Sequence, residues 1–422
     1  MDWLRSRRQI SGYHLLLAGV FALALFLRFF GQNWDQGIYL HPDERFIAIV
    51  SSDRVAMPPL NDIWSILDPA TSSLNPRRDD MNGNPESFAY GTLPMYVQGT
   101  VSWLLSLVSN TEFGSYPETY RVGRPLTALV DMFTLLFVFL LARRLAGRYA
   151  ALVAAALYAL AVLPIQLSHF FAVDIWLTCF VAATIYLAVR YTDAPTLWRA
   201  MALAVPVGCA FATKASVPSL LVPLAATFGW VLWKYPQRLE IVGHALGAGV
   251  ASLAVFTVFE PYALVRFQPF TEDIRTQARI VRGQFDVPFT RQFVGLTPGL
   301  YELRNMFLFT LGPALLVSGI AGFFLAARRA ISRMDVAWLL PVLWVVAYVP
   351  ILIATEARFL RYSLPLVPFI AIFAATLLIG LPRIGRIPVA RVATALVLII
   401  TATWAVGFVS IYARENPRIA AS

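Results

Sequence analysis

The chain has 422 residues, of which 58% are hydrophobic and 14% charged, and its mean hydropathy is +0.66. A soluble fold of this composition would expose too much apolar surface, so most of the chain must lie in a membrane. The formal net charge of +10 comes from arginines in short clusters between apolar runs, which favours a role in membrane orientation and argues against a nucleic-acid partner.

The first apolar run covers residues 13–30 and follows Arg5, Arg7 and Arg8. Because no small-residue cleavage site follows this run, we expect a retained membrane helix with the N-terminus in the cytoplasm, not a signal peptide. Apolar runs near the ~20 residues that cross a bilayer recur as far as residue 412. The predicted fold is an all-α integral membrane protein with about eleven transmembrane helices, near residues 13–30, 124–142, 149–165, 171–190, 199–213, 216–233, 239–260, 304–326, 334–354, 363–381 and 391–412.

This threading places the C-terminus outside and the basic turns at 143–148, 190–199, 234–238 and 328–333 in the cytoplasm, as the positive-inside rule requires. The run at 91–109 is also long enough to cross, but a span there would reverse every later helix. Glycines and a proline interrupt it, so we interpret it as an interfacial or re-entrant segment.

The prediction is a single membrane domain, residues 1–422, with two long extracytoplasmic loops. The first, 31–121, carries the acidic pair and short interfacial helices, and the second covers residues 261–301. Within the second loop, residues 283–293 mix aromatic and polar groups, which suits either substrate contacts or anchoring at the interface. This loop also contains five arginines that depart from the positive-inside rule, and binding of an anionic group would explain them. They are Arg266, Arg275, Arg279, Arg282 and Arg291.

An acidic pair, Asp43 and Glu44, follows the first predicted helix within residues 39–46. Transfer of a sugar to a hydroxyl needs a base that removes the acceptor's proton, and such a base typically contributes about 100- to 10,000-fold in rate. Either carboxylate could supply it. By itself an exposed acidic pair is more often part of a solvated loop.

Three further stretches accompany this pair: residues 166–174, with Asp174 at the start of a predicted helix, residues 212–214, and residues 358–365, which contain an Arg-Tyr-x-x-Pro pattern. Together with the acidic pair they resemble membrane glycosyltransferases of the C-type fold, in the protein O-mannosyltransferase and aminoarabinose-transferase group. The resemblance extends over most of the chain, including helix number and loop lengths. His41-Pro42 before the pair departs from the better-known members, so the substrate is not carried over.

The resemblance implies a sugar donor linked to a polyprenyl phosphate, an extracytoplasmic site and transfer with inversion, with no cofactor required. The acceptor would be a hydroxyl of a protein, lipid or glycan, and the setting a bacterial plasma membrane that the chain crosses many times. Asp43 would be the base, and Glu44 would orient Asp43 or the acceptor.

Other candidate site residues lie on the same predicted outer face. Asp174 could hold a sugar hydroxyl or position His169, or it could simply mark a polar helix end near headgroups. The cations Lys214, Arg358 and Arg361, with the adjacent Tyr362, could stabilise a departing lipid phosphate, although outer-surface cations more often contact headgroups.

The remaining polar residues predict less. Asp131, in the second predicted helix, is a minor candidate, while His14 and His244 are interpreted as structural. Cys179 and Cys209 lie in apolar runs as buried small hydrophobes. No metal site is expected, because no ligand pair stands at a recognisable spacing.

Two alternatives to an enzyme stay open. A transporter or flippase of a lipid-linked or small anionic substrate would show charges near the midplane of several helices or repeated halves, and the charges gather on the outer face instead. A non-catalytic protein of the same fold would keep the bundle without depending on Asp43.

Overall fold

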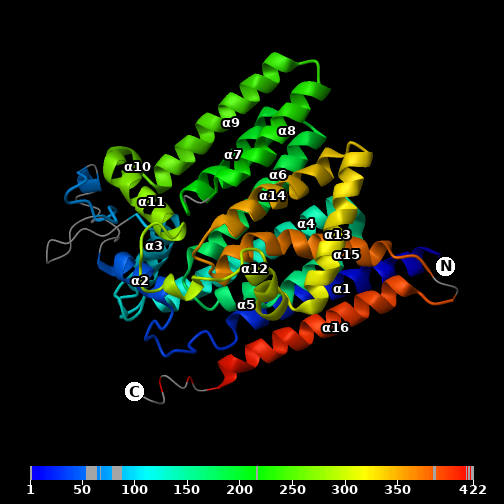
Figure 1. Cartoon of the computed structure of the whole chain (residues 1–422), viewed down its shortest axis with the longest axis horizontal. Coiled ribbons are helices and arrows are strands. Elements are labelled where there is room, and N and C mark those ends of the chain that lie inside the picture. Colours follow the sequence, from blue (N-terminus) through cyan, green and yellow to red (C-terminus); the bar gives the residue numbers. More distant parts are fainter. Residues whose placement is uncertain are drawn as a thin grey trace.

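A computed structural model describes residues 2–53, 64–66, 68–77, 88–214, 217–383, 386–414, 416 and 419, and the side chains from residue 12 onwards. The side chains of Arg5, Arg7 and Arg8, and parts of the predicted first loop, lie outside these described residues. Figure 1 shows a bundle of helices in which α1 begins and α16 ends at opposite ends of the molecule. The helices are α1 (Asp2–Phe29), α2 (Pro42–Asp53), α3 (Leu93–Leu107), α4 (Tyr120–Ala159), α5 (Val162–Leu167), α6 (Val173–Asp193), α7 (Leu197–Phe211), α8 (Leu221–Lys234), α9 (Arg238–Phe259), α10 (Tyr262–Val265), α11 (Phe267–Val281), α12 (Leu300–Asn305), α13 (Pro313–Ser332), α14 (Val336–Ala354), α15 (Val367–Gly380) and α16 (Val389–Val409).

Short helical turns complete the chain: η2 (Pro218–Leu220), η3 (Arg291–Phe293), η5 (Leu360–Leu366) and η6 (Ser410–Ala413) are 3₁₀-helices, and η4 (Met306–Thr310) is a π-helix. Among the described residues, 8 helices are long and apolar enough to cross a membrane. They are α1, α4, α6, α9, α13, α14, η5 with α15, and α16 with η6. The chain is therefore a multi-span, all-helical membrane protein.

Every predicted span has a helical counterpart. The predicted helices at 124–142 and 149–165 correspond to the two parts of α4, which are separated by Gly147, because its φ of 87° and ψ of 179° interrupt the helix. The predicted helices at 199–213 and 216–233 correspond to α7 and α8, which have only 15 and 14 residues. The number and direction of the crossings stay predictions.

The centre of the bundle is formed by α6 and α15, which are buried along most of their length. The helix α6 packs against α4 and α7, and α15 packs against α4 and α13. At the periphery, α9 exposes Leu246, Val250 and Leu253. Such an exposed apolar face on a long helix is what contact with lipid requires.

Both predicted long loops contain helices, and these helices meet at one end of the bundle. Figure 1 shows α2, α3, α10 and α11 gathered at the end opposite to the N-terminus. The helix α3 occupies the run predicted as interfacial, and it begins against the C-terminal ends of α7 and α9. The backbone N–H groups of Gly91 and Leu93 donate to the carbonyls of Thr213 and Ala212 after α7, and the Thr92 N–H donates to the Glu260 carboxylate after α9.

Candidate active site

Four charged side chains from separate segments form one connected series of ion pairs at this end of the bundle. They are Asp43 in the first turn of α2, Asp174 in the first turn of α6, Lys214 after α7 and Arg361 in η5. Arg361 Nε lies 3.0 Å from Asp43 Oδ2 and 3.8 Å from Asp174 Oδ2. Lys214 Nζ donates a 2.8 Å hydrogen bond to Asp174 Oδ1. We call these four residues the Asp43 cluster.

The Asp43 cluster keeps polar atoms that a ligand could engage. Asp43 Oδ2, Asp174 Oδ2 and Arg361 Nε are buried and make no hydrogen bond of good geometry with the described residues. The cluster is also not sealed, because the side chains of Asp43, Arg361 and Lys214 remain 12%, 16% and 16% exposed. Two carboxylates and two cations balance in charge, so an entering phosphate would compete with the carboxylates for Arg361 and Lys214.

Aromatic rings line the Asp43 cluster. The ring of Tyr362 lies 4.8 Å from Lys214 Nζ and 5.4 Å from the Arg361 guanidinium carbon, so it contacts both cations. Tyr90 lies beside Asp43, and burial together with the negative charge of that carboxylate holds the Tyr90 pKa well above its usual value. The phenol therefore stays neutral and keeps its proton as a donor. The sequence predicts Tyr362 but contains no signal for Tyr90.

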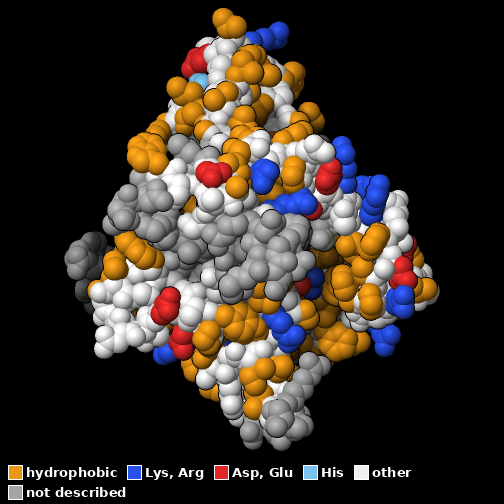
Figure 2. Space-filling model, turned by 90° about the vertical axis from the view of Figure 1, so that its left-hand side faces the viewer, with side chains coloured by type: hydrophobic (Ala, Val, Ile, Leu, Met, Phe, Trp, Pro, Cys, Tyr) orange, Lys and Arg blue, Asp and Glu red, His pale blue; other side chains and the backbone are white. Residues whose placement is uncertain are grey.

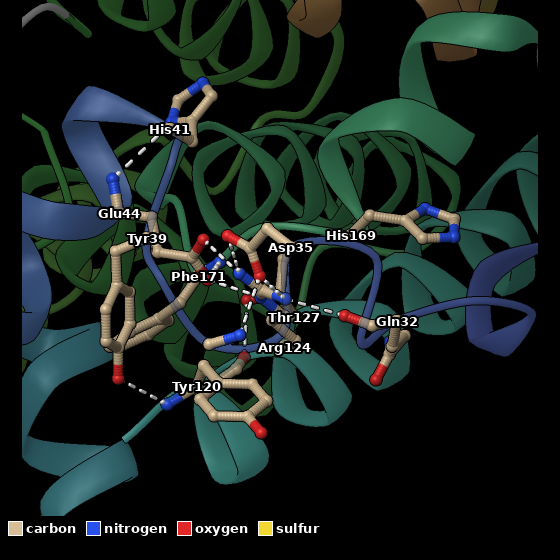
Figure 3. A network of polar contacts seen from close by, with 12 residues as sticks. Gln32, Asp35, Tyr39, His41, Glu44, Tyr120, Arg124, Thr127, His169 and Phe171 are labelled. Carbon is tan, nitrogen blue, oxygen red and sulfur yellow. Dashed lines mark hydrogen bonds and ion pairs between the residues drawn. The ribbon is translucent and has the colours of Figure 1, made fainter. Parts of the chain in front are cut away.

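Glu44 has a different environment from its neighbour Asp43, and Figure 3 shows Glu44 beside Arg124, Asp35 and Phe171. It is fully buried, and it accepts hydrogen bonds from Arg124 Nε and Nη2 at 2.7 and 2.8 Å and from the Phe171 N–H at 2.9 Å. Arg124 also donates to Asp35 at 2.9 Å. Burial alone would raise the Asp35 pKa, but the hydrogen bond and charge of Arg124 hold it below its usual range. With both oxygens engaged, Glu44 is placed to fix α2 and not to accept a proton from a substrate.

Arg124 is the functional neighbour that sequence reasoning missed. It is fully buried at the start of α4 and donates to the Gln32 carbonyl at 2.7 Å as well as to the two carboxylates. A lone arginine at the edge of an apolar run looks like any helix end, so only the fold shows that it joins the chain after α1 to the first turn of α2.

His169 does not face the Asp43 cluster, contrary to the predicted substrate contact. Its ring is fully buried, with Nδ1 2.7 Å from the Ile165 carbonyl and Nε2 2.9 Å from the Phe30 carbonyl. It stacks on Tyr412 at 3.8 Å, and Figure 3 shows it turned away from Glu44. These contacts hold the end of α1 against α5 and the end of α16. We therefore assign His169 a structural role and not substrate binding.

Arg358 is likewise outside the Asp43 cluster. Its side chain is buried, and its Nη1 lies 2.5 Å from Glu302 Oε1 and 3.3 Å from the Ile353 carbonyl. The predicted phosphate contact is therefore corrected to an internal ion pair with α12. Asp131, the minor candidate, is paired with Arg28 at 2.5 Å and accepts from Tyr158 inside the bundle. Within the described part of the chain, no group of three or more His, Cys, Asp or Glu residues could hold a metal ion.

A lateral groove of about 490 Å³ lies between α5, η4, η5 and α16. Its walls are mainly apolar and include Leu308, Phe309, Trp404 and Phe408. Leu360 also lines it and directly precedes Arg361. The apolar groove therefore includes the residue that precedes Arg361 in the sequence.

Comparisons with known proteins place this geometry in context. Residues 100–262 match the family described as dolichyl-phosphate-mannose-protein mannosyltransferase. The structure of ArnT from Cupriavidus metallidurans bound to undecaprenyl phosphate is similar with a TM-score of 0.56 and 16% identity, over 95% of this chain and 76% of that one. The oligosaccharyltransferase AglB from Archaeoglobus fulgidus, in complex with an inhibitory peptide and a dolichol-phosphate, gives a TM-score of 0.59 and 16% identity, over 96% of this chain and 56% of that one.

The chain thus spans just over half the length of the archaeal oligosaccharyltransferase. A comparison with curated proteins gave no match. The likeness to ArnT and AglB shows that the chain has the fold of membrane glycosyltransferases, which confirms the resemblance inferred from the sequence. The matched family residues contain Asp174 and Lys214 but not Asp43 or Arg361.

Proposed function

We propose that the protein is a glycosyltransferase that moves a sugar from a polyprenyl-phosphate-linked donor to a hydroxyl of a protein, lipid or glycan, with inversion, on the extracytoplasmic face of a bacterial plasma membrane. The observation that carries this proposal is the meeting of Asp43, Arg361, Asp174 and Lys214 in one partly accessible cluster. The fold supports it, because the relatives named above are glycosyltransferases and two of their structures hold a polyprenyl phosphate.

In the proposed step, Asp43 removes the proton of the acceptor hydroxyl. The acceptor oxygen forms a bond to the anomeric carbon of the sugar while the bond from that carbon to the phosphate oxygen breaks. The electron pair of the broken bond remains on the lipid phosphate, and the proton remains on Asp43. Attack from the side opposite the phosphate inverts the anomeric centre.

The cations would stabilise the departing lipid phosphate. Arg361 can engage phosphate oxygens with its fork of N–H donors, and Lys214 acts as a point charge beside it. Charge that develops on the leaving group is best stabilised by donors already in place. The apolar groove that begins at Leu360 would take part of the isoprenoid tail, so that the phosphate lies at Arg361.

Substitution of Asp43 by Asn tests the proposal. In proteoliposomes with a radiolabelled polyprenyl-phosphate sugar, mannose first, Asp43→Asn should lower transfer by about 100- to 10,000-fold, the usual contribution of a general base. The melting temperature should change little, since Asp43 is partly exposed. Asp286→Asn removes a carboxylate whose side chain is 66% exposed and serves as the matched control.

Transfer by Asp43→Asn at the wild-type rate would remove the catalytic assignment. Movement of the labelled lipid across the membrane without formation of a glycosidic bond would favour the transporter instead.

A further inference from the structure

Three arginines lie along one exposed face of α11 and its C-cap: Arg275, Arg279 and Arg282. Their spacing of four and three residues places them on one side of the helix. Each is exposed, and none of the three makes an ion pair or hydrogen bond with the residues that the structure describes. We propose that this arginine stripe binds the headgroups of anionic phospholipids at the outer surface of the membrane.

Several other charges of the same loop are engaged. Asp273 accepts a hydrogen bond from the Phe88 N–H at 2.9 Å and lies 3.3 Å from Arg77. Arg291 forms an ion pair with Asp286 at 2.6 Å. The three arginines outnumber the exposed carboxylate on the same face, Glu272, which lies three residues before Arg275. The structure separates these arginines from Arg291, although the sequence groups all of them.

The helix α11 is held so that the stripe points away from the protein. Its apolar side packs inward, where the ring of Phe270 lies 5.4 Å from that of Phe88. At its C-terminal end the Val281 carbonyl accepts the N–H groups of Glu356 and Ala357 at 2.9 and 3.1 Å. With both ends fixed, the arginines need little further ordering to meet a ligand. Figure 2 shows Lys and Arg side chains spread over this end of the molecule, with Asp and Glu side chains among them.

The position of α11 favours headgroups as the ligand. The candidate span α9 ends at Phe259, and α10 and α11 follow directly, so the stripe begins close to the membrane surface. Leu264, Val265 and Phe267 lie between the span and the stripe and are 47%, 60% and 63% exposed. At a membrane surface, the apolar interior gives way to a layer of phosphate headgroups. Exposed apolar side chains followed by arginines fit this order.

The experiment compares lipid retention by the whole protein in nanodiscs of equal phosphatidylglycerol and phosphatidylcholine, read by native mass spectrometry. Wild type should retain phosphatidylglycerol preferentially. The triple variant Arg275→Gln, Arg279→Gln, Arg282→Gln should lose about fivefold or more of this preference, because one basic residue near an anionic surface contributes roughly that factor. The triple Lys variant should keep most of it, since charge is preserved.

The control is Arg291→Gln in the same loop, which should leave the preference unchanged because Arg291 is already paired. A wild-type preference in the triple Gln variant would overturn the proposal. Loss of the preference in the Lys variant as well would overturn it too, by assigning the stripe to a ligand that needs the arginine fork. Lipid retention requires no sugar transfer, so these outcomes are independent of the proposed enzymatic function.

Discussion

Asp43 and Glu44 are adjacent, yet α2 turns them towards different partners. Asp43 meets Arg361 in the partly accessible cluster, while Glu44 is buried against Arg124. Sequence alone predicts an acidic pair at this position but leaves open which residue is the base, because the environments come from α4 and η5. The geometry supports Asp43 as the base and Glu44 as the residue that positions it.

Glu44→Gln should lower the stability of the protein. It weakens two hydrogen bonds from a buried guanidinium, and bonds to charged groups contribute about 1.5–3 kcal/mol each. A thermal melt of purified protein should therefore show a lower midpoint than for Asp43→Asn. Transfer by the folded Glu44→Gln fraction should remain measurable, and its complete loss would contradict the assignment of the base to Asp43 alone.

At the scale of elements, the start of α3 packs against the ends of α7 and α9 next to the Asp43 cluster. A Cβ at Gly91 would lie 2.1 Å from the Ala212 carbonyl oxygen, so only glycine allows this approach. Tyr90 precedes the contact and Lys214 follows it, so the docking of α3 holds two residues at the cluster.

Gly91→Ala should destabilise the protein by about 1–3 kcal/mol, the usual cost of overpacking, and should lower transfer by displacing Tyr90 and Lys214. Gly114→Ala is the control, because a Cβ at Gly114 meets nothing within 4 Å. Equal melting temperatures for the two variants would show that the contact between Gly91 and Ala212 is not needed.

Glu260 makes the same junction sensitive to pH. Its carboxylate accepts from the Thr92 N–H at 2.6 Å, and burial raises its pKa from 4.5 to about 8. Because the pKa of Glu260 is raised in the folded state, its protonated carboxyl stabilises the fold fully below the unfolded pKa of 4.5. This stabilisation is lost as pH rises through about 8. The melting temperature of wild type should therefore fall between pH 5 and about pH 9 more steeply than that of Glu260→Gln. If the melting temperatures of wild type and Glu260→Gln changed in parallel with pH, this would contradict the burial of a protonated carboxyl at residue 260.

Elements were predicted better than contacts. The apolar runs locate every long helix, because a span must be apolar over its length. They also predict two helices within α4, because the basic turn at 143–148 separates the apolar runs on either side of Gly147. They do not show that the 261–301 segment contains helices, because α11 is only amphipathic.

At the scale of the whole molecule, the prediction that Asp43, Asp174, Lys214 and Arg361 share one chamber agrees with their observed ion pairs. The pattern of charge along the chain placed all four residues on the same predicted face of the helix bundle. His169 and Arg358 were assigned to that end by the same reasoning, but which way a side chain points at a helix end is decided by packing.

The account depends most on the side of the membrane that this end faces. Ile38, between α1 and α2, is 48% exposed, and Met334, between α13 and α14, is 62% exposed, while Cys179 and Cys209 are buried. In intact cells, a membrane-impermeant maleimide should label Ile38→Cys at once and Met334→Cys only after the membrane is permeabilised. Labelling in the reverse order would put the Asp43 cluster in the cytoplasm and would contradict sugar transfer on the outer face.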